Sequence, residues 1–231
     1  MSAGRVLFVG CGPGAPDLLT LRAVHALATA DVVIWNAAQI AREAVDAHMR
    51  PDAALLAWPP ATERDIRAVY DRALAEDLTV VRLKGGDPML LGAMEPELSS
   101  VRERGLACEV VPGVSAVGAG AAALLTEIAT AVAPLLLADA ATLPAALDPG
   151  SALAVHNAGG DPRALQHDLL ARGLAAQTPC DVVIEVSRRP EILVSCALCE
   201  LAETLEDMGR GLLCLVLVRP STNVRFGVDL G

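Results

Sequence analysis

The stretch VGCGPGAPDLLTLRAVHALATADVVIW, residues 9–35, decides the fold of this chain. It continues a short apolar run at residues 5–9 and opens with glycines at positions 10, 12 and 14, a turn that no β-branched residue could occupy easily. Apolar residues at helical spacing then predict a helix over residues 18–30, and residues 31–35 form a second apolar run. A strand, a tight turn, a helix and a strand in this order predict one unit of a parallel sheet.

The alternation of strands and helices continues outward from this unit as far as residue 125. Further strands are predicted over residues 78–83 and 108–111, and helices over residues 41–48, 63–76, 91–104 and 115–125. After Glu127 there is less helix between strands, which are predicted over 135–137, 151–155, 181–186 and 212–218, with helices over 162–171 and 196–208. Thr62, with Asp65 three residues on, predicts a capped helix start. We therefore expect an α/β fold of two domains, residues 1–112 with a mostly parallel sheet and residues 113–231 with a mixed sheet.

The composition excludes several classes of protein. With 53% apolar and 20% charged residues among 231, the chain can bury a large core and is not disordered over most of its length. Its 18 basic and 28 acidic residues give a formal net charge of −10, the wrong sign for a general binder of nucleic acid. The aromatic residues are two Phe, two Trp and one Tyr, so we expect any flat ligand to be held by aliphatic walls and backbone groups.

The cysteines and the apolar segments predict a reduced, cytoplasmic protein that holds no metal. No secretory context accompanies the six cysteines. Cys196 and Cys199 form a CxxC pair, which occurs in redox and metal sites, but no second pair and no histidine at ligand spacing accompany it. We therefore expect both to pack as small hydrophobic residues of a helix. The most apolar region, residues 110–138, is interrupted by proline, glycine and glutamate, so we expect no membrane span.

Three small-residue turns follow predicted strands and have both structural and functional interpretations. Residues 10–14 could bind a dinucleotide or a nucleoside, or could form only a tight turn; a Rossmann site would need an acid where Asn36 stands, and no P-loop pattern is present. In the turn at 85–88, Asp87 could accept a hydrogen bond from a ligand or could cap its own turn. Residues 112–113 form the third turn. Because ligands bind at the carboxyl ends of parallel strands, the three turns predict one site.

The histidines provide one further candidate. No serine or cysteine stands with histidine and aspartate in a pattern of nucleophilic catalysis. His25 and His167 lie in predicted helices and are expected to face solvent, whereas His156 ends a predicted strand beside Asn157. His156 is therefore a candidate site residue, with a purely structural position as the alternative.

Three motifs in fixed order resemble the tetrapyrrole methylase family. They are residues 9–35, VVRLKGGDPMLLGA at 80–93 and VVPGVSAVGAGAAALLTEI at 110–128, and residues 178–203 are similar to the C-terminal strand–helix segment of that family. The resemblance implies an S-adenosylmethionine-dependent methyltransferase of the cobalamin or sirohaem (porphyrin) pathways. It also implies the class III methyltransferase fold, with the cofactor in the cleft between two α/β domains, and a homodimer.

The resemblance further implies a cofactor site built from small-residue turns and main chain. Pro13 would lie against the sulfonium, and Ser115 and Ala116 would lie beside the methyl donor. The residues implied to wrap the methionine end and the ribose are Gly85, Gly86, Asp87 and Leu90. Those whose main chain is implied to hold the adenine are His156, Asn157 and Val186.

Within the family, the turn at residues 10–20 and the helix after residue 113 look most similar to the precorrin-4 C11-methyltransferases. Uroporphyrinogen methyltransferases carry an aspartate just after the second strand, where this chain has Asn36. Precorrin-4 is already nucleophilic at carbon, so the resemblance implies catalysis by positioning, with no assigned catalytic residue. The candidates for contact with the carboxylates of the substrate are Lys84, Arg188 and Arg189. The segment that normally helps to bind the tetrapyrrole is shortened here, between residues 126 and 149.

Several alternatives remain open on the sequence. Within the family, the chain could act on another corrin or on uroporphyrinogen, or could have been repurposed for a different substrate. In another class, it could be a pseudoenzyme that binds the cofactor and serves as a partner subunit. A third alternative is an NAD-dependent oxidoreductase, which the glycine turn at residues 10–14 permits.

Overall fold

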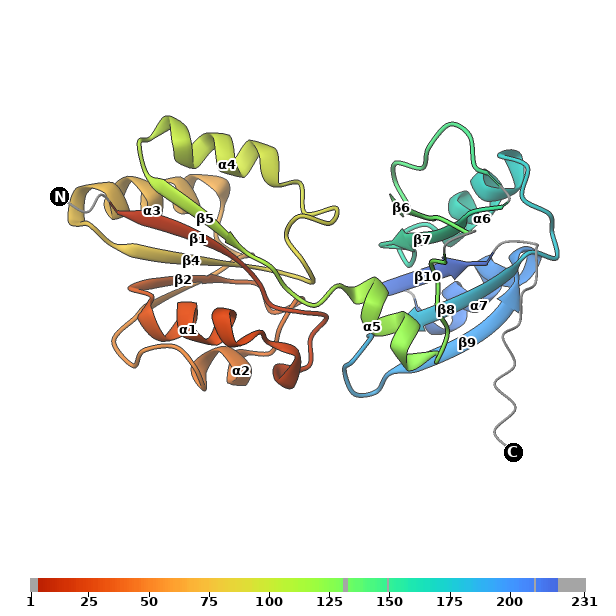
Figure 1. The fold of residues 1–231 in the computed structure, drawn as a ribbon, viewed down its shortest axis with the longest axis horizontal. Helices are drawn as coiled ribbons and strands as arrows, with labels where there is room; N and C mark the ends of the chain where they lie inside the picture. Colours follow the sequence, from red (N-terminus) through yellow and green to blue (C-terminus); the bar gives the residue numbers. More distant parts are fainter. Residues whose placement is uncertain (1–3, 131–132, 149, 210, 220–231) are drawn as a thin grey trace. The chain divides into compact units, whose positions relative to one another are not determined.

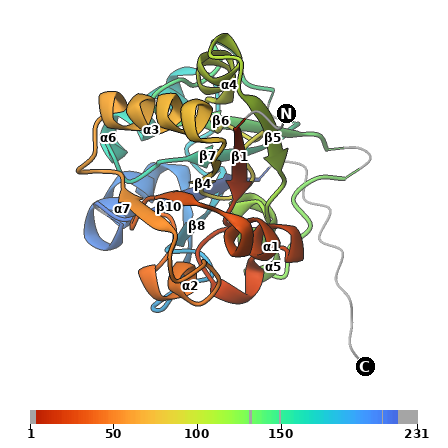
Figure 2. The same ribbon diagram turned by 90° about the vertical axis from the view of Figure 1, so that its left-hand side faces the viewer.

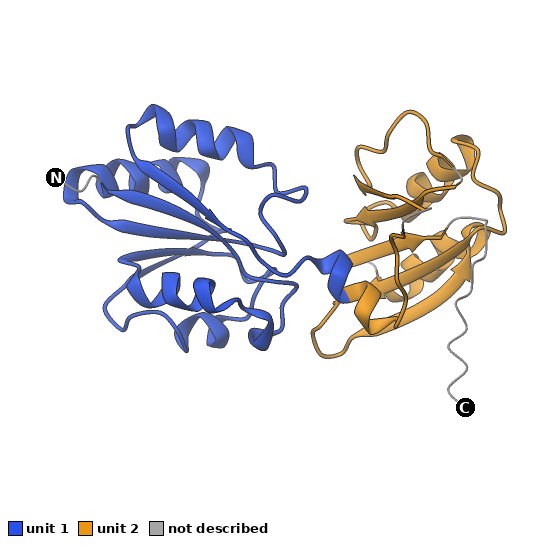
Figure 3. Cartoon of the chain, viewed as in Figure 1, with its two compact units in different colours: residues 1–119 blue, residues 120–231 orange. Residues whose placement is uncertain are grey.

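The structure is a computed structural model that describes residues 4–130, 133–148, 150–209 and 211–219. The chain forms two compact units, unit 1 at residues 1–119 and unit 2 at residues 120–231 (Figure 3). Each unit is built on its own five-stranded sheet. The sheet of unit 1 is parallel throughout and that of unit 2 is mixed, so the predicted α/β fold is confirmed.

Unit 1 is a doubly wound parallel sheet with strand order β3-β2-β4-β1-β5 (Figure 1). Its strands are β1 (Arg5–Gly10), β2 (Val32–Trp35), β3 (Ala54–Ala57), β4 (Thr79–Lys84) and β5 (Ala107–Val111). Its helices are η1 (Pro16–Leu18), α1 (Leu21–Thr29), α2 (Arg42–Asp46), α3 (Glu63–Glu76) and α4 (Met94–Glu103), and α5 (Ala116–Ala123) follows β5. Because the five strands are all parallel, their carboxyl ends lie at one edge of the sheet.

The side chains of β1 alternate between two cores, as expected for a strand buried on both faces. Leu7 and Val9 pack with residues of α1 and α2, whereas Val6 and Phe8 pack with residues of α3 and α4. Figure 2 shows these two helix pairs on opposite faces of the sheet of unit 1. The apolar run at residues 5–9 is thus continuous because β1 is buried on both faces of the sheet.

The start of α3 follows from local chemistry. The Thr62 hydroxyl accepts a hydrogen bond from the main-chain N–H of Asp65 at 3.3 Å, and the Asp65 carboxylate accepts one from the main-chain N–H of Thr62 at 2.7 Å. These bonds satisfy two N–H groups at the start of the helix, and the hydrogen bond from Thr62 lowers the pKa of Asp65. The predicted cap and both predicted ends of this helix are confirmed.

Unit 2 has strand order β6-β7-β10-β8-β9, with β6 and β7 parallel and the other pairs antiparallel. Its strands are β6 (Leu135–Asp139), β7 (Ala152–His156), β8 (Pro179–Ile184), β9 (Ile192–Ala197) and β10 (Cys214–Val218). Its helices are α6 (Pro162–Ala171), η2 (Leu198–Glu200) and α7 (Leu201–Met208), besides the end of α5. The Asp161 carboxylate caps α6 by accepting from the N–H of Ala164 at 3.0 Å.

Three secondary-structure predictions are corrected by the structure. The strands β3 and β9 were not predicted: β3 is a short edge strand that pairs with β2 across a helix, and β9 forms an edge hairpin with β8 whose last two residues were assigned to a helix. The helix predicted from residue 196 starts at Leu201, since Cys196 is still part of β9 and pairs with Cys180 of β8. The helix predicted from residue 91 starts at Met94, because Leu91 and Ala93 have positive φ angles of 58° and 48°.

The two cysteines of the CxxC pair lie in different surroundings. Cys196 is partly buried against the core of unit 2, and burial raises the pKa of its thiol. Cys199 lies in η2 and is exposed, so it does not pack as the sequence predicts. Burial also raises the pKa of the neighbouring Cys180 to about 12. Within the described part of the chain, no group of three or more His, Cys, Asp or Glu side chains is arranged to hold a metal ion.

None of the helices in the described ranges is both long enough and apolar enough to cross a bilayer.

One buried polar atom in unit 1 gives a stability prediction. The hydroxyl of Tyr70, in α3, is buried and has no hydrogen-bond partner among the described residues. Because an unpaired buried hydroxyl is destabilising, we expect Tyr70→Phe to raise the free energy of unfolding by about 1 kcal/mol in urea titrations followed by circular dichroism. Tyr70→Ala, which removes the ring from the core, should instead be strongly destabilising. A loss of stability in the Phe variant would mean that the hydroxyl has a partner.

Candidate functional site

The structure brings the three predicted glycine turns together at the carboxyl ends of β1, β4 and β5. Gly12 and Gly86 pair through two main-chain hydrogen bonds, from Gly86 N to Gly12 O at 2.8 Å and from Gly12 N to Gly86 O at 3.3 Å. A Cβ atom added to Gly113 would lie 2.1 Å from the carbonyl oxygen of Gly86. Side chains are therefore excluded where the three turns meet, and backbone packs directly on backbone.

The backbone conformation also favours glycine at positions 12 and 86. Gly12 and Gly86 have φ angles of 70° and 62°, in the left-handed region that disfavours residues with a side chain. Gly85 is exposed and Gly86 is half-buried, so their main chain is accessible from solvent. This part of unit 1 can thus present backbone groups to a ligand at close range.

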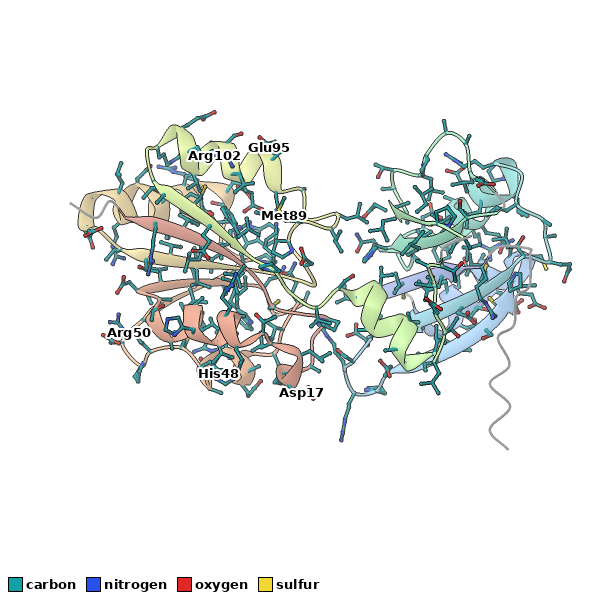
Figure 4. All side chains as sticks on the ribbon, in the orientation of Figure 1. Asp17, His48, Arg50, Met89, Glu95 and Arg102 are labelled. Atoms are coloured by element: carbon teal, nitrogen blue, oxygen red, sulfur yellow. The ribbon has the colours of Figure 1, made fainter. Side chains whose placement is uncertain are left out.

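Asp87 holds two of the turns in place. One carboxylate oxygen accepts from the N–H of Met89 at 2.8 Å, and the other accepts from the N–H of Gly113 at 3.2 Å. The carboxylate therefore caps its own turn and ties that turn to the end of β5. Its implied contact with the cofactor stays a prediction. Leu90 follows in the same loop and is exposed, as is Met89, which Figure 4 labels.

The remaining unit 1 candidates lie in the same turns. Pro13 is buried within the turn after β1. The Ser115 hydroxyl accepts from the N–H of Val117 at 3.2 Å at the start of α5. A Cβ added to Gly86 would lie 3.7 Å from the main-chain nitrogen of Ala116, so the start of α5 is next to the turn after β4. Each unit 1 residue that the resemblance assigns to the cofactor thus lies in one of the turns that follow β1, β4 and β5 or at the start of α5.

The unit 2 candidates lie at the ends of β7 and β8. His156 ends β7 opposite Asp139 of β6, and burial lowers its pKa although Asp139 acts to raise it. Asn157 has a φ of 58° and donates through its side-chain amide to Asp139 at 2.6 Å. Val186 is buried between two residues with positive φ, at 52° and 60°. Strained backbone of this kind is concentrated at functional sites, but the implied contact with adenine stays a prediction.

Two of the substrate-side candidates are arginines in the loop after β8. The Arg188 guanidinium forms an ion pair with Glu185 at 3.1 Å, and Arg189 is exposed. Their proposed role as a carboxylate clamp stays a prediction.

A pocket that sequence reasoning missed lies at the carboxyl ends of β2 and β4. Its lining residues all belong to unit 1 and are Ile34, Trp35, Asn36, Gln39, Trp58, Arg82, Leu83 and Lys84. We call it the tryptophan pocket, because it contains both tryptophans of the chain. Trp58 directly follows β3, so recognition of that strand would have placed the two tryptophans at the ends of neighbouring strands. Two walls of this pocket are indole rings, and the expectation that a flat ligand is held by aliphatic walls and backbone groups stays a prediction.

Three polar residues of the tryptophan pocket have partners just outside it. Glu97, on α4, forms hydrogen-bonded ion pairs with Arg82 and with Lys84, the latter at 2.7 Å. Burial acts to raise the pKa of Glu97, but the hydrogen bonds from Arg82 and Lys84 outweigh it, so the pKa is lowered. The side-chain oxygen of Asn36 accepts from the N–H of Ala38 at 2.9 Å. Glu97 is therefore ionised and a poor base, and Asn36 cannot take up a proton.

A doubly wound parallel sheet whose strands end in glycine turns defines the class of α/β proteins that bind ligands at the carboxyl ends of their strands. The chain belongs to the Tetrapyrrole (Corrin/Porphyrin) Methylases, whose sequence profile matches residues 5–202. This is a family of S-adenosylmethionine-dependent tetrapyrrole methyltransferases, so the resemblance in the sequence and the predicted cofactor are confirmed.

Two relatives illustrate the range of substrates in this family. The chain is 31% identical over 217 residues to a uroporphyrinogen-III C-methyltransferase of Paracoccus denitrificans (strain Pd 1222), covering 87% of this chain and 76% of that one. It is 32% identical over 215 residues to a precorrin-4 C(11)-methyltransferase of Mycobacterium tuberculosis (strain CDC 1551 / Oshkosh), covering 87% and 85%. Other relatives are longer, and the chain matches 25% of the length of the siroheme synthase of Psychrobacter sp. (strain PRwf-1). Relatives at the same level of identity thus carry the names of enzymes for two different tetrapyrroles.

A solved structure supports the fold and the cofactor of the family. Uroporphyrin-III C-methyltransferase from Thermus thermophilus, complexed with S-adenosylhomocysteine, is similar with a TM-score of 0.71 at 28% sequence identity. The match covers 92% of this chain and 92% of that chain.

The shared position of Glu97 between two cations predicts a pH-dependent effect on stability. Because its folded pKa is lowered, Glu97 contributes fully above the unfolded value of about 4.3, and this contribution is lost as the pH falls through the folded pKa. We expect Glu97→Gln to lower the free energy of unfolding at pH 7 by about 1–2 kcal/mol, and the difference from the unmodified chain to shrink below about pH 4. Urea titrations at several pH values measure both.

The matched control is Glu95→Gln. Glu95 is exposed and lies two residues before Glu97 on the same helix (Figure 4). It should change stability little at any pH. A Glu97→Gln variant as stable as the unmodified chain at pH 7 would show that the two ion pairs contribute nothing.

Proposed function

We propose that this protein transfers the methyl group of S-adenosylmethionine to a ring carbon of a tetrapyrrole in corrin biosynthesis, with C11 of precorrin-4 as the acceptor. Membership of the family supports the methyl transfer, and the 32% identity to a precorrin-4 C(11)-methyltransferase supports the choice of substrate. The observation that carries this choice is Asn36. The resemblance implies an aspartate at this position in uroporphyrinogen methyltransferases, and a carboxamide cannot replace it as a proton acceptor.

The cofactor fits the residues at the glycine turns. Accessible backbone at Gly85 and Gly86, where the φ of Gly86 disfavours a side chain, suits a ligand that is recognised through main-chain groups rather than through charges. Pro13, Asp87, Leu90, Ser115 and Ala116 complete the proposed site in unit 1. When bound, S-adenosylmethionine supplies a methyl group on a positively charged sulfur.

The chain's own contribution to the reaction is then positional. A carbon that is already nucleophilic needs alignment with the methyl group at short range, and holding two reactants in that arrangement can account for most of the rate increase. Neither Glu97, which is ion-paired with Arg82 and Lys84, nor Asn36 is suited to remove a proton. This agrees with a substrate that requires no strong general base.

The first measurement is a calorimetric titration with S-adenosylhomocysteine, with NAD as the control ligand. We expect micromolar binding of the first and none of the second. Gly12→Val should abolish the binding, because a β-branched residue at a φ of 70° distorts the turn. Gly105→Val is the matched control: Gly105 also has a positive φ, of 77°, but nothing lies within 4 Å of its Cβ position and it is outside the turns. Binding of NAD instead would favour the oxidoreductase alternative.

The second measurement identifies the substrate. We expect transfer of a labelled methyl group from S-adenosylmethionine to precorrin-4. With uroporphyrinogen III we expect at least tenfold lower kcat/KM, because this chain has Asn36 in place of the proton acceptor that the reaction with uroporphyrinogen requires. The reverse preference would assign the chain to the activity of its Paracoccus relative. Binding of S-adenosylhomocysteine without transfer to either tetrapyrrole would support the pseudoenzyme alternative.

The homodimer and the cytoplasmic location that the sequence predicts belong to the same proposal. Sedimentation equilibrium of the purified chain, with and without S-adenosylhomocysteine, measures the oligomeric state directly.

A further inference from the structure

The tryptophan pocket lies where ligands of parallel sheets bind, yet it is distinct from the glycine turns. It is formed at the carboxyl ends of β2 and β4, with Trp58 contributed by the residue after β3. It encloses at most about 230 Å³. That figure includes the solvent at its mouth, and the cavity itself has a volume of only about 20 Å³, so it admits a carboxylate and the edge of one ring rather than a whole macrocycle.

The pocket contains both tryptophans of a chain that has few aromatic residues. Only five of 231 residues are aromatic, and both tryptophans lie here, each half-buried. The indole N–H of Trp35 donates to the carbonyl of Ile40 at 2.8 Å, which fixes the ring, and the main-chain N–H of Trp58 donates to the carbonyl of Trp35 at 2.7 Å. An arginine lies over one face of each ring, Arg42 at 5.9 Å from the Trp35 centroid and Arg82 at 5.3 Å from that of Trp58, so a planar ligand can use only the other face.

The charges of the pocket favour an anion. Arg82 and Lys84 carry two positive charges and Glu97 one negative charge, so this cluster is locally positive in a chain with a net charge of −10. The Arg82 guanidinium is buried, 5.3 Å from the centroid of the Trp58 ring, and is held by Glu97. Lys84 is the more accessible cation, and Glu97 accepts only one of its three N–H donors in the ion pair at 2.7 Å.

We propose that the tryptophan pocket binds the edge of one carboxylate-bearing pyrrole ring of the substrate, with the ring against Trp58 and its carboxylate on the ammonium of Lys84. Glu97 acts as a positioning residue, because it holds Arg82 and Lys84 without touching the ligand. This inference rests on the proposed function, and it identifies the position at which one edge of the macrocycle is held.

The test compares binding of uroporphyrin III, a stable planar tetrapyrrole with eight carboxylates, across variants of the full chain by calorimetry. We expect Lys84→Met and Trp58→Leu each to weaken this binding about tenfold and to leave the affinity for S-adenosylhomocysteine unchanged. Lys84→Arg should retain most of the affinity, since it keeps a cation at the same place. Arg72→Met, on the exposed face of α3, is the matched control and should bind like the unmodified chain.

A second measurement keeps the inference testable if Lys84→Met does not fold. Lys84 is the only lysine of the chain, so acetic anhydride modifies a single side-chain amine. We expect uroporphyrin III to slow acetylation of Lys84 at least tenfold and to leave that of the N-terminal amine unchanged. Equal rates with and without the tetrapyrrole would overturn the inference.

The outcomes separate this inference from the proposed function. If the unmodified chain binds uroporphyrin III and methylates precorrin-4, but the Lys84 and Trp58 variants bind equally well, the pocket assignment is wrong and the proposed function stands. If the unmodified chain neither binds the tetrapyrrole nor transfers a methyl group to one, both are wrong.

Discussion

Direct packing of backbone on backbone at the ends of β1, β4 and β5 is the constraint on which the rest of unit 1 depends. A Cβ on Gly10 would lie 2.6 Å from the nitrogen of Gly113, and one on Gly113 would lie 2.1 Å from the carbonyl of Gly86. Three parallel strands can end this close together only where side chains are absent. The same absence exposes main-chain groups at the edge where parallel sheets bind their ligands, so one steric requirement serves both folding and recognition.

Two acidic residues at this edge stabilise the structure. Asp87 joins two turns through its hydrogen bonds to Met89 and Gly113, and Glu97 balances Arg82 and Lys84. Such an arrangement suits a reaction in which alignment, rather than proton transfer, limits the rate. It also leaves a small positive region in an acidic protein, where a substrate rich in carboxylates would be attracted locally although the molecule as a whole repels it.

Features with a local physical cause could be predicted from the sequence. The capping pair of Thr62 and Asp65 and the proline after Asp161 predict the ends of α3 and α6 correctly, and the glycine spacing predicts the turns. Features that depend on distant partners could not. The edge strand β3 is defined by pairing with β2 on the other side of a helix, and the contacts of Glu97 with Arg82 and Lys84 join residues 15 and 13 positions apart on different elements. The tryptophan pocket was missed for this reason, since Trp58 gains its place from the unpredicted strand β3.

The unequal distribution of aromatic residues has an optical consequence. Trp35, Trp58 and Tyr70 all lie in unit 1, and residues 120–231 contain neither tryptophan nor tyrosine. Absorption at 280 nm and intrinsic fluorescence therefore originate in unit 1 alone, whereas far-ultraviolet circular dichroism arises from the helices and strands of both units. The two signals, recorded on the same sample, distinguish concerted unfolding of the units from sequential unfolding without any introduced label.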